Sequence, residues 1–245
     1  MTNKIRTNEG AAALALALVM GAPLLAADAG CGGAATLPQP GRTALAARET
    51  GARSAGVSLC DEVTAANLSF EAPVLGGRVG RSDYAQVDGW EAPTGRVIIG
   101  RVDPSRTPLQ TSAYGSQHGL LHPLLPVTSG QPGNELETTI TVEPGARYAL
   151  VFSVASLRSG NQLRLRLEGT DAEPRSLPVP EGAWREEVVL FTATGPRVRL
   201  EAFAPTPTVD HGALAYNRGE VDVLFDIAGV FRVCDAPTES AADAP

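Results

Sequence analysis

The chain is poor in cysteine, lysine and aromatic residues. Its 245 residues include only 3 Cys, 2 Trp and 4 Tyr, and aromatic residues make up 5% of the total. Lys4 is the sole lysine, and the formal net charge is −7. This acidic balance argues against nucleic acid as a partner, because binding to phosphates needs a basic surface. With so few aromatic side chains, each Trp and Tyr carries more information than usual.

The chain also lacks an apolar run long enough to cross a bilayer, which takes about 20 residues. The longest run, residues 11–27, follows a basic start at Lys4 and Arg6. A short apolar run after a basic start is typical of a secretory signal peptide. The small residues of Ala27-Asp28-Ala29 fit a cleavage site. We therefore expect residues 1–29 to be a signal and the protein to be exported to the periplasm, cell surface or medium.

Cys31 follows the predicted signal almost directly and is followed by two glycines. A Cys in this place resembles the lipidated Cys of bacterial lipoproteins, although Asp28 stands where those have an aliphatic residue. Cys31 is also the odd cysteine if the other two pair. It is a lipidation candidate; an intermolecular disulfide or a free thiol are the alternatives. Lipidation would be the protein's one predicted contact with a membrane.

The other two cysteines, Cys60 and Cys234, bracket nearly all of the strand-rich part of the chain. An export signal implies a compartment that permits oxidation. We therefore expect one disulfide between the first and last strands, with two free thiols as the alternative. Closing so long a loop would stabilise the fold by about 3–5 kcal/mol.

Short segments with alternating apolar and polar residues dominate the region between these cysteines. In residues 147–155, for example, Tyr148, Leu150 and Phe152 share one face, which is the pattern of a half-buried strand. Strands are predicted at 67–71, 96–101, 135–142, 147–155, 161–168, 185–192, 197–203 and 221–233. No long segment has a helical period. About eight strands joined by turns predict an all-β protein, an antiparallel jelly-roll β-sandwich.

The predicted domain organisation follows from these patterns. It consists of a signal peptide at 1–29, an Ala/Gly/Pro-rich flexible tether at 30–58, the jelly-roll domain at 59–236 and a disordered tail at 237–245. The domain is large enough to bury most of its apolar surface.

Several short motifs occur in an order that resembles a known family. They are Asn67-Leu68-Ser69-Phe70-Glu71-Ala72-Pro73, Gly89-Trp90, the hairpin Pro144–Phe152, Trp184, Phe191–Gly195 and Asp226-Ile227-Ala228-Gly229-Val230. Together they resemble the galactose-binding-domain-like jelly rolls of exported bacterial and plant cell-wall proteins, which are similar to carbohydrate-binding modules. The resemblance implies core packing for Trp90 and Trp184. It also implies Glu71 and Asp226 as ligands of a structural Ca²⁺, the alternative being two solvated charges at strand ends.

Three long stretches, 76–90, 103–133 and 205–218, show no regular alternation of apolar and polar residues, and they hold most of the tyrosines and histidines of the domain. Long loops of this kind are often functional. An aromatic face can stack on a sugar ring while polar neighbours bind its hydroxyls. The candidate ligand-binding residues are Tyr84, Tyr114 and Tyr216, with Gln117, His118, Asp210 and Asn217 as polar partners. For each one alone, a structural role is the alternative.

No residue set forms a convincing active site. The G-x-S-x-G elbow of many hydrolases is absent, and no pair of carboxylates is singled out as in glycosidases. His118 and His122 have the spacing of a zinc motif but lack its acid, and Gly119 and Pro123 disfavour a helix. We therefore expect a non-catalytic exported module that binds carbohydrate. The alternatives are an envelope component that interacts with proteins, and an unrecognised hydrolase.

Overall fold

The structure is a computed structural model that describes residues 56–75, 80–84, 86–93, 97–101, 109, 112–123 and 135–234. The predicted signal peptide, Cys31, most of the predicted tether and the predicted tail lie outside these residues. In the part of the chain that the structure describes, no helix is both long and apolar enough to span a membrane.

Eleven strands and one short helix make up the described elements. The strands are β1 Leu59–Glu62, β2 Gly80–Tyr84, β3 Val97–Arg101, β4 His118–Leu121, β5 Glu135–Thr141, β6 Arg147–Ser156, β7 Gln162–Glu168, β8 Arg175–Pro178, β9 Arg185–Thr192, β10 Arg197–Phe203 and β11 Val223–Val233; the helix is α2 Gly212–Asn217. The strands predicted from 96 to 101 and from 135 onward are therefore confirmed, with ends shifted by no more than two residues.

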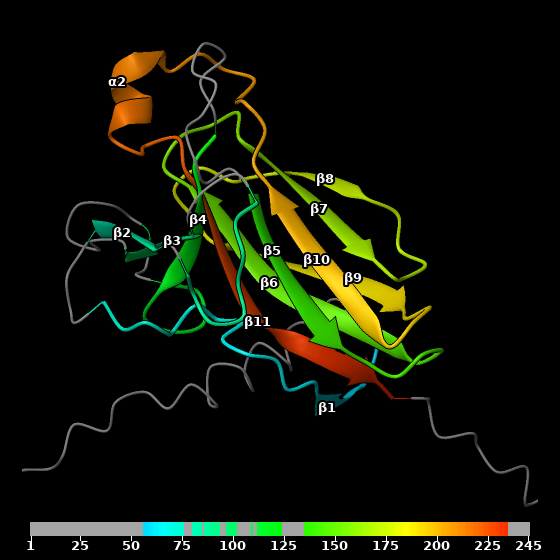
Figure 1. The fold of residues 1–245 in the computed structure, drawn as a ribbon. Helices are drawn as coiled ribbons and strands as arrows, with labels where there is room; N and C mark the ends of the chain where they lie inside the picture. Colours follow the sequence, from blue (N-terminus) through cyan, green and yellow to red (C-terminus); the bar gives the residue numbers. More distant parts are fainter. Residues whose placement is uncertain are drawn as a thin grey trace, which may run out of the picture. The chain divides into compact units, whose positions relative to one another are not determined.

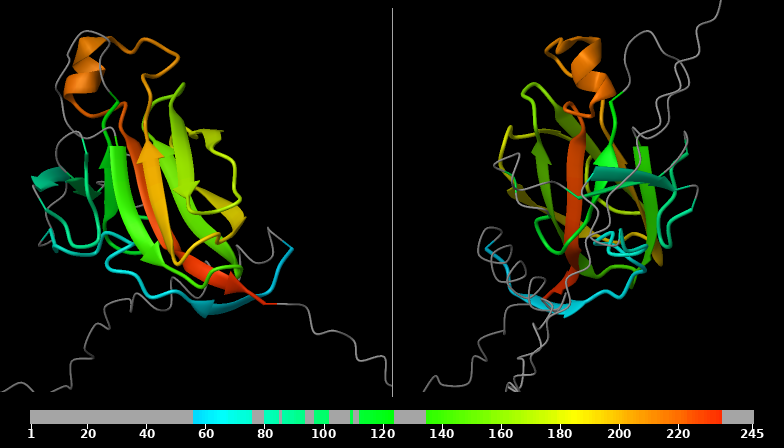
Figure 2. Two further views of the ribbon diagram at one scale, coloured as in Figure 1. Left: turned by 45° about the vertical axis from the view of Figure 1, so that its right-hand side comes forward. Right: turned by 90° about the vertical axis from the view of Figure 1, so that its left-hand side faces the viewer.

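The strands form two antiparallel sheets that pack face to face (Figure 1). The larger sheet has the order β2-β3-β4-β11-β6-β9, with β1 added beside β11, and the smaller has the order β5-β10-β7-β8. The chain crosses between sheets from β5 to β6 to β7, and again from β9 to β10 to β11. The predicted jelly-roll β-sandwich is confirmed. α2 lies at one end of the sandwich and β1 at the other (Figures 1 and 2).

The core lies between the sheets and follows from the alternation in the sequence. Leu136 and Ile140 of β5 face inward with Val198 and Leu200 of β10, and all four are at most 1% exposed. From the larger sheet, Phe152 of β6 is fully buried against them. Each fully buried apolar side chain of this size contributes about 1.5–3 kcal/mol, so these facing pairs fix the register of the sheets.

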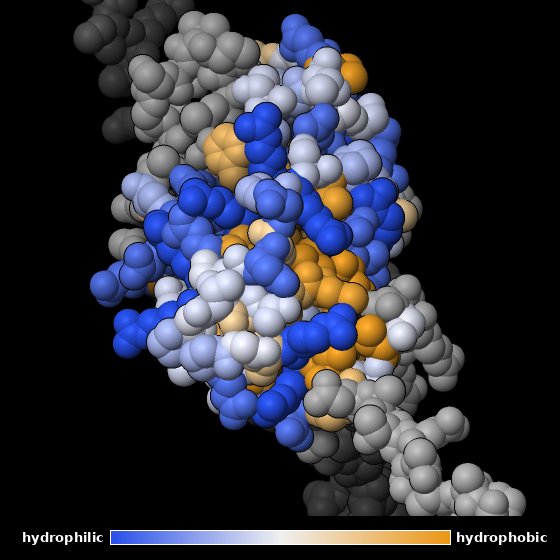
Figure 3. Space-filling view, turned by 90° about the vertical axis from the view of Figure 1, so that its right-hand side faces the viewer, coloured by the Kyte–Doolittle hydropathy of each residue, from blue (hydrophilic) through white to orange (hydrophobic). Residues whose placement is uncertain are grey.

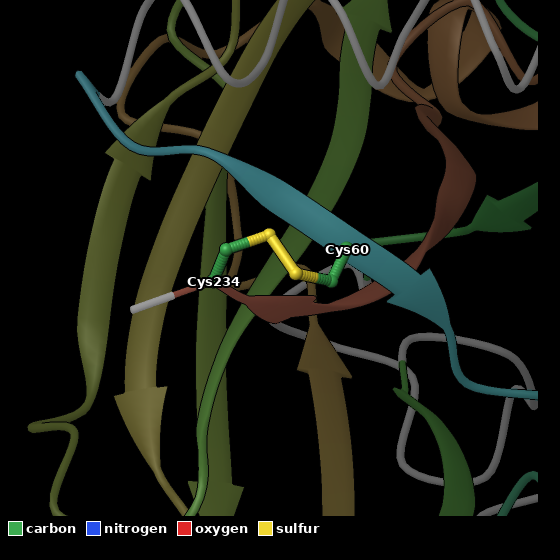
Figure 4. The surroundings of a disulfide bond; sticks show 2 residues. All are labelled: Cys60 and Cys234. Atoms are coloured by element: carbon green, nitrogen blue, oxygen red, sulfur yellow. A yellow bond between two sulfur atoms is a disulfide. The ribbon is translucent and has the colours of Figure 1, made fainter. Parts of the chain in front are cut away.

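β11 is the central strand of the larger sheet and joins the two ends of the domain. Its first residues pair with β4, its last with β1, and its other edge pairs with β6 along nearly its whole length. The chain continues from β11 into Cys234, which forms a disulfide with Cys60 of β1 across a Cα–Cα distance of 5.4 Å (Figure 4). The predicted disulfide is therefore confirmed.

One predicted strand is wrong: residues 67–71 form no strand, and residues 66–69 form a turn. Asn67 and Phe70 have positive φ angles of 51° and 60°, which a strand does not permit. The Asn67 side chain holds the turn by donating to the Ala72 carbonyl at 2.6 Å and accepting from its N–H at 2.8 Å. The turn directs Phe70 inward, where it stacks on Trp90 with ring centroids 4.4 Å apart. Core packing of Trp90 is thus confirmed.

Candidate functional site

The outer face of the larger sheet carries a row of polar residues across three neighbouring strands. Glu186 of β9 lies opposite Ser153 of β6, and Ser153 lies opposite Asp226 of β11. Apolar side chains surround this row on the same face, among them Ala149 and Val151 of β6. A polar row in an apolar face needs hydrogen-bond partners from outside the sheet.

Residues 112–114 supply these partners by passing over the row. Asp226 Oδ2 accepts hydrogen bonds from the Ser112 hydroxyl, the Ala113 N–H at 3.0 Å and the Tyr114 N–H at 2.9 Å. Burial raises the pKa of Asp226 to about 7, although its hydrogen bonds from Ser112 and the backbone act in the opposite direction. Asp226 therefore fixes this segment to the centre of the sheet.

A second carboxylate holds the following residues of the same segment. Glu71 accepts hydrogen bonds from the Ser116 N–H at 2.8 Å, the Ser116 hydroxyl at 2.7 Å and the Gln117 N–H at 3.0 Å. Gly115 lies so close to Glu71 that a Cβ at this position would fall 2.1 Å from Oε1. The two carboxylates thus clamp residues 112–117 between them.

The clamp positions Tyr114 over the polar row. Its hydroxyl accepts a hydrogen bond from the Ser153 hydroxyl at 2.8 Å and donates to Glu186 Oε2 at 3.0 Å. Burial, with the neighbouring charge of Glu186, raises the pKa of Tyr114 far above its usual range, so the phenol stays protonated. Tyr114 therefore acts as a fixed donor to Glu186.

Trp184 approaches the same place from the turn before β9. Gly182 begins this approach with a φ of 71°, which favours glycine, and its N–H donates to the Ser156 carbonyl at the end of β6, at 2.8 Å. The Trp184 ring is half-buried, and the ring of His118 meets it edge to face at a centroid distance of 5.5 Å. Trp184 thus differs from the core position that the family resemblance implied: it packs on the outer face of the sheet.

These side chains line a pocket of about 400 Å³. Its walls are Leu109, Ala113, Tyr114, Ser153, Gly182, Ala183, Trp184 and Glu186. We call it the Trp184 pocket. One wall is the indole of Trp184, and another carries the hydroxyls of Tyr114 and Ser153 and the carboxylate of Glu186. Ser153 and Glu186 lie on paired strands, and Tyr114 lies in the clamped segment 112–117. The volume lies in the range of small-molecule sites.

Glu186 is the one charged side chain among the described residues that line the Trp184 pocket. Burial raises its pKa, while the hydrogen bond from Tyr114 opposes the shift. Its second oxygen, Oε1, is buried and has no hydrogen-bond partner. An acceptor left in this state costs about 1–3 kcal/mol, more when it is charged, so a donor from a ligand would stabilise it.

The open edge of the larger sheet lies next to this pocket. β9 is the last strand of its sheet, and Val188 and Leu190 on its outer face are half-buried. Figure 3 faces the side of β8 and β9 and shows apolar residues gathered near the middle of a largely hydrophilic surface. β9 thus has apolar residues on both faces: Val189 and Phe191 face the core, while Val188 and Leu190 lie on the outer face. A strand with two apolar faces is typical of a sheet that is covered on both sides.

A larger hollow of about 950 Å³ lies on the outer face of the smaller sheet. Trp90 contributes to its lining, but its ring is only 3% exposed and its indole N–H donates to the Asn67 carbonyl. Arg199 in the hollow pairs with Glu137 at 2.5 Å and with Glu201 at 3.4 Å. The side chains of Arg199 and Glu137 in this hollow are thus paired with each other, whereas Oε1 of Glu186 in the Trp184 pocket has no hydrogen-bond partner.

The structure places two of the predicted ligand-binding residues at the Trp184 pocket. Tyr114 lines it, and His118 supports the indole from behind while only 1% exposed. Gln117 is 2% exposed and serves as a structural link: it donates to the Phe70 and Pro73 carbonyls and accepts from the Leu75 N–H.

The remaining predicted ligand-binding residues lie elsewhere. Tyr84 ends β2 and is partly buried against the main core. Tyr216 of α2 is 3% exposed and packs with Ala215 and Val221, while exposed Asp210 accepts from the Gly212 N–H at 2.8 Å. The Asn217 side chain lies outside the part of the molecule that the structure describes. The structure therefore does not bring these residues into one site.

The two predicted calcium ligands, Glu71 and Asp226, both converge on residues 112–117. Of their four carboxylate oxygens, Asp226 Oδ1 is the one without a hydrogen-bond partner. Ca²⁺ takes 6–8 oxygen ligands, so these side chains do not form its site by themselves. Among the described residues, no group of three or more His, Cys, Asp or Glu could hold a metal ion. The calcium site stays a prediction.

No protein-family model matches the chain, and no curated protein matches it. Among solved structures, the chain is similar to a family 61 carbohydrate-binding module in complex with β-1,4-galactotriose. The two share 14% identity, the match covers 71% of this chain and 99% of that chain, and the TM-score is 0.42. It is also similar to the family 22 xylan-binding domain from Paenibacillus barcinonensis, with 13% identity, 65% and 99% covered, and a TM-score of 0.36.

A third similar structure is a family two carbohydrate esterase from Cellvibrio japonicus, with 11% identity, 64% of this chain and 35% of that chain covered, and a TM-score of 0.31. The solved structures similar to this chain thus include both binding modules and an enzyme. Identities and TM-scores this low do not assign a ligand.

Proposed function

We propose that the protein is an exported, non-catalytic module that binds carbohydrate in the Trp184 pocket. One observation carries the proposal: the indole of Trp184, the hydroxyl of Tyr114 and the carboxylate of Glu186 line one pocket of about 400 Å³. Sugar rings have apolar faces that stack on aromatic rings and hydroxyls that bond to fixed polar groups. The pocket offers both kinds of surface within the size of a sugar residue.

The rigidity of the pocket supports a binding role. Tyr114 is held by both Asp226 and Ser153, and Glu186 is held by Tyr114. Groups that are already in place lose little conformational entropy when a ligand binds. A weakly held ligand such as a sugar gains from this pre-organisation.

The pocket lining supports a non-catalytic role. Glycoside hydrolysis commonly uses two facing carboxylates, and the described residues that line the pocket include one, Glu186. The Ser153 hydroxyl donates to Tyr114 rather than to a histidine, so it lacks the base that activates a serine nucleophile. Export and attachment at the cell surface rest on the predicted signal peptide and on Cys31.

A glycan array probed with the purified chain tests the proposal. Two variants accompany the wild type: Trp184→Ala removes the indole, and Phe203→Ala removes a half-buried ring on the outer face of the smaller sheet. We expect the wild type and Phe203→Ala to bind the same glycans and Trp184→Ala to lose them.

Two other outcomes would redirect the proposal. Loss of binding in Phe203→Ala, with binding kept in Trp184→Ala, would move the site to the smaller sheet. A blank array for the wild type would contradict carbohydrate binding and favour an envelope component that interacts with proteins.

A further inference from the structure

Among the described residues that line the Trp184 pocket, none carries a positive charge to balance Glu186. Glu186 is the single charged residue in the described lining, and its only hydrogen bond is the one from the neutral Tyr114 phenol. The nearest arginine in sequence, Arg185, is used elsewhere: it pairs with Glu187 at 2.6 Å and donates to the Pro178 carbonyl. The described lining of the pocket therefore presents a carboxylate without a positively charged partner.

The unpaired oxygen of Glu186 belongs to a side chain that lines the pocket. Oε1 is buried without a partner, while Oε2 is held by Tyr114. The terminal torsion of a glutamate has a broad energy profile, so rotation about it can turn Oε1 toward a ligand. A charged donor would satisfy this oxygen better than a neutral one, because charge-assisted hydrogen bonds are about twice as strong.

The indole of Trp184 favours the same kind of ligand group. Trp is the strongest of the aromatic side chains in cation–π interactions, which contribute more as the cation loses water. An indole and a carboxylate in one small pocket thus both attract a cation, whereas they repel an acidic sugar.

We propose that the Trp184 pocket selects sugar residues that carry a protonated amine, such as glucosamine units, over neutral and acidic sugars. The inference rests on the proposed function and names the class of sugar that the pocket takes. The ring of the sugar would stack on Trp184 while its ammonium group donates to Glu186.

Three trisaccharides test this selectivity, because they share a β-1,4-linked glucose-type backbone and differ at C2. They carry an ammonium group (glucosamine trimer), an acetamide (N-acetylglucosamine trimer) or a hydroxyl (cellotriose). Binding to the full chain is measured by titration calorimetry at about pH 6, which keeps most of the sugar amines protonated, and again at about pH 7, because burial raises the pKa of Glu186. We expect the glucosamine trimer to bind about tenfold more tightly than either of the others.

Two variants identify the group responsible. Glu186→Gln keeps the shape of the side chain and removes its charge, so we expect the preference for the amine to disappear. Glu187→Gln is the matched control, because Glu187 is the next residue on the same strand but does not line the pocket. We expect Glu187→Gln to keep the preference for the amine. The melting temperatures of both variants, compared with that of the wild type, show whether the fold is retained.

Several results would overturn the inference. These are equal binding of the three trisaccharides, tighter binding of either neutral one, no binding of the glucosamine trimer, or a preference that survives Glu186→Gln. Putrescine, an amine without a sugar ring, must compete poorly; competition equal to that of the glucosamine trimer would contradict an amino-sugar site. The proposed function itself fails if the wild type binds nothing on the glycan array or if Trp184→Ala keeps the binding, so the two failures are distinguishable.

Discussion

Ser153 and Glu186 lie directly opposite each other on β6 and β9, and the Tyr114 hydroxyl bridges them. Neither strand carries Tyr114, which comes from a segment held down by Asp226 in the next strand. Two strands and a clamped loop thus build one polar wall of the Trp184 pocket. Changes in any of these contacts should affect stability and ligand binding together.

The bridge predicts the effect of Tyr114→Phe. The variant keeps the ring but removes the donor to Glu186 and the acceptor of Ser153, and it leaves the half-buried Glu186 carboxylate without the hydrogen bond from Tyr114. We expect a loss of about 1–3 kcal/mol in the free energy of unfolding, measured with denaturant. Tyr84→Phe, on another strand, is the control and should lie near the wild type. Equal stability of Tyr114→Phe and wild type would show that the bridge contributes nothing.

Asp226 predicts a dependence of stability on pH. Its pKa is about 7 in the folded protein, whereas in an unfolded chain an Asp pKa is about 3.9. The folded state keeps a proton that the unfolded state has lost, so the free energy of unfolding falls as the pH rises between these two values. Below about pH 4 and above about pH 7 this group contributes no further change.

Asp226→Asn tests this dependence, because it removes the titration of Asp226 alone. Other acids with raised pKa values, such as Glu135 and Glu186, remain in both proteins, so their effects cancel when the two are compared. The difference in unfolding free energy, variant minus wild type, should increase as the pH is raised from about 4 to about 7. A difference that stays constant over this range would refute a raised pKa for Asp226.

The disulfide predicts a large change in stability. Cys60 and Cys234 close a loop with a sequence separation of 174. Replacing both by Ser should lower the unfolding free energy by about 3–5 kcal/mol in denaturant. Cys31→Ser is the control and should not change it. A double variant as stable as the wild type would mean that β1 and β11 hold the ends without the bond.

Glu71→Gln separates the clamp of residues 112–117 from the predicted calcium site. The variant keeps one acceptor oxygen but turns a second acceptor into a donor. Since Glu71 accepts three hydrogen bonds, we expect a loss of about 1–3 kcal/mol in stability. The loss should be the same with Ca²⁺ and with a chelator. A loss seen only with Ca²⁺ would contradict the clamp and support the metal site.

The strands of the sandwich could be predicted because their side chains alternate. In β7, for example, Leu163, Leu165 and Leu167 are buried between exposed arginines, and this pattern is visible in the sequence. Residues 67–71 misled the prediction because their composition suits a strand. Their conformation depends on Asn67 bonding back to the chain at Ala72, a contact that alternation does not reveal.

The Trp184 pocket could be predicted only in part. Tyr114 was a candidate as a loop aromatic, but Trp184 and Glu186 were missed because they come from a different part of the chain. One signal was available: Val188 and Leu190 face the side of β9 opposite to Val189 and Phe191, so both faces are apolar. Apolar residues on both faces of β9 indicate that its outer face, which also carries Glu186, is covered by another segment. The alternation does not reveal which segment covers it, because that depends on contacts between residues far apart in the sequence.

A crystal structure of the chain with the best ligand from the glycan array would show whether the sugar binds in the Trp184 pocket. We expect a sugar ring stacked on the indole of Trp184, with a ligand donor about 3 Å from a carboxylate oxygen of Glu186. A sugar bound over Glu137 and Arg199 on the smaller sheet, with the Trp184 pocket unchanged, would contradict it.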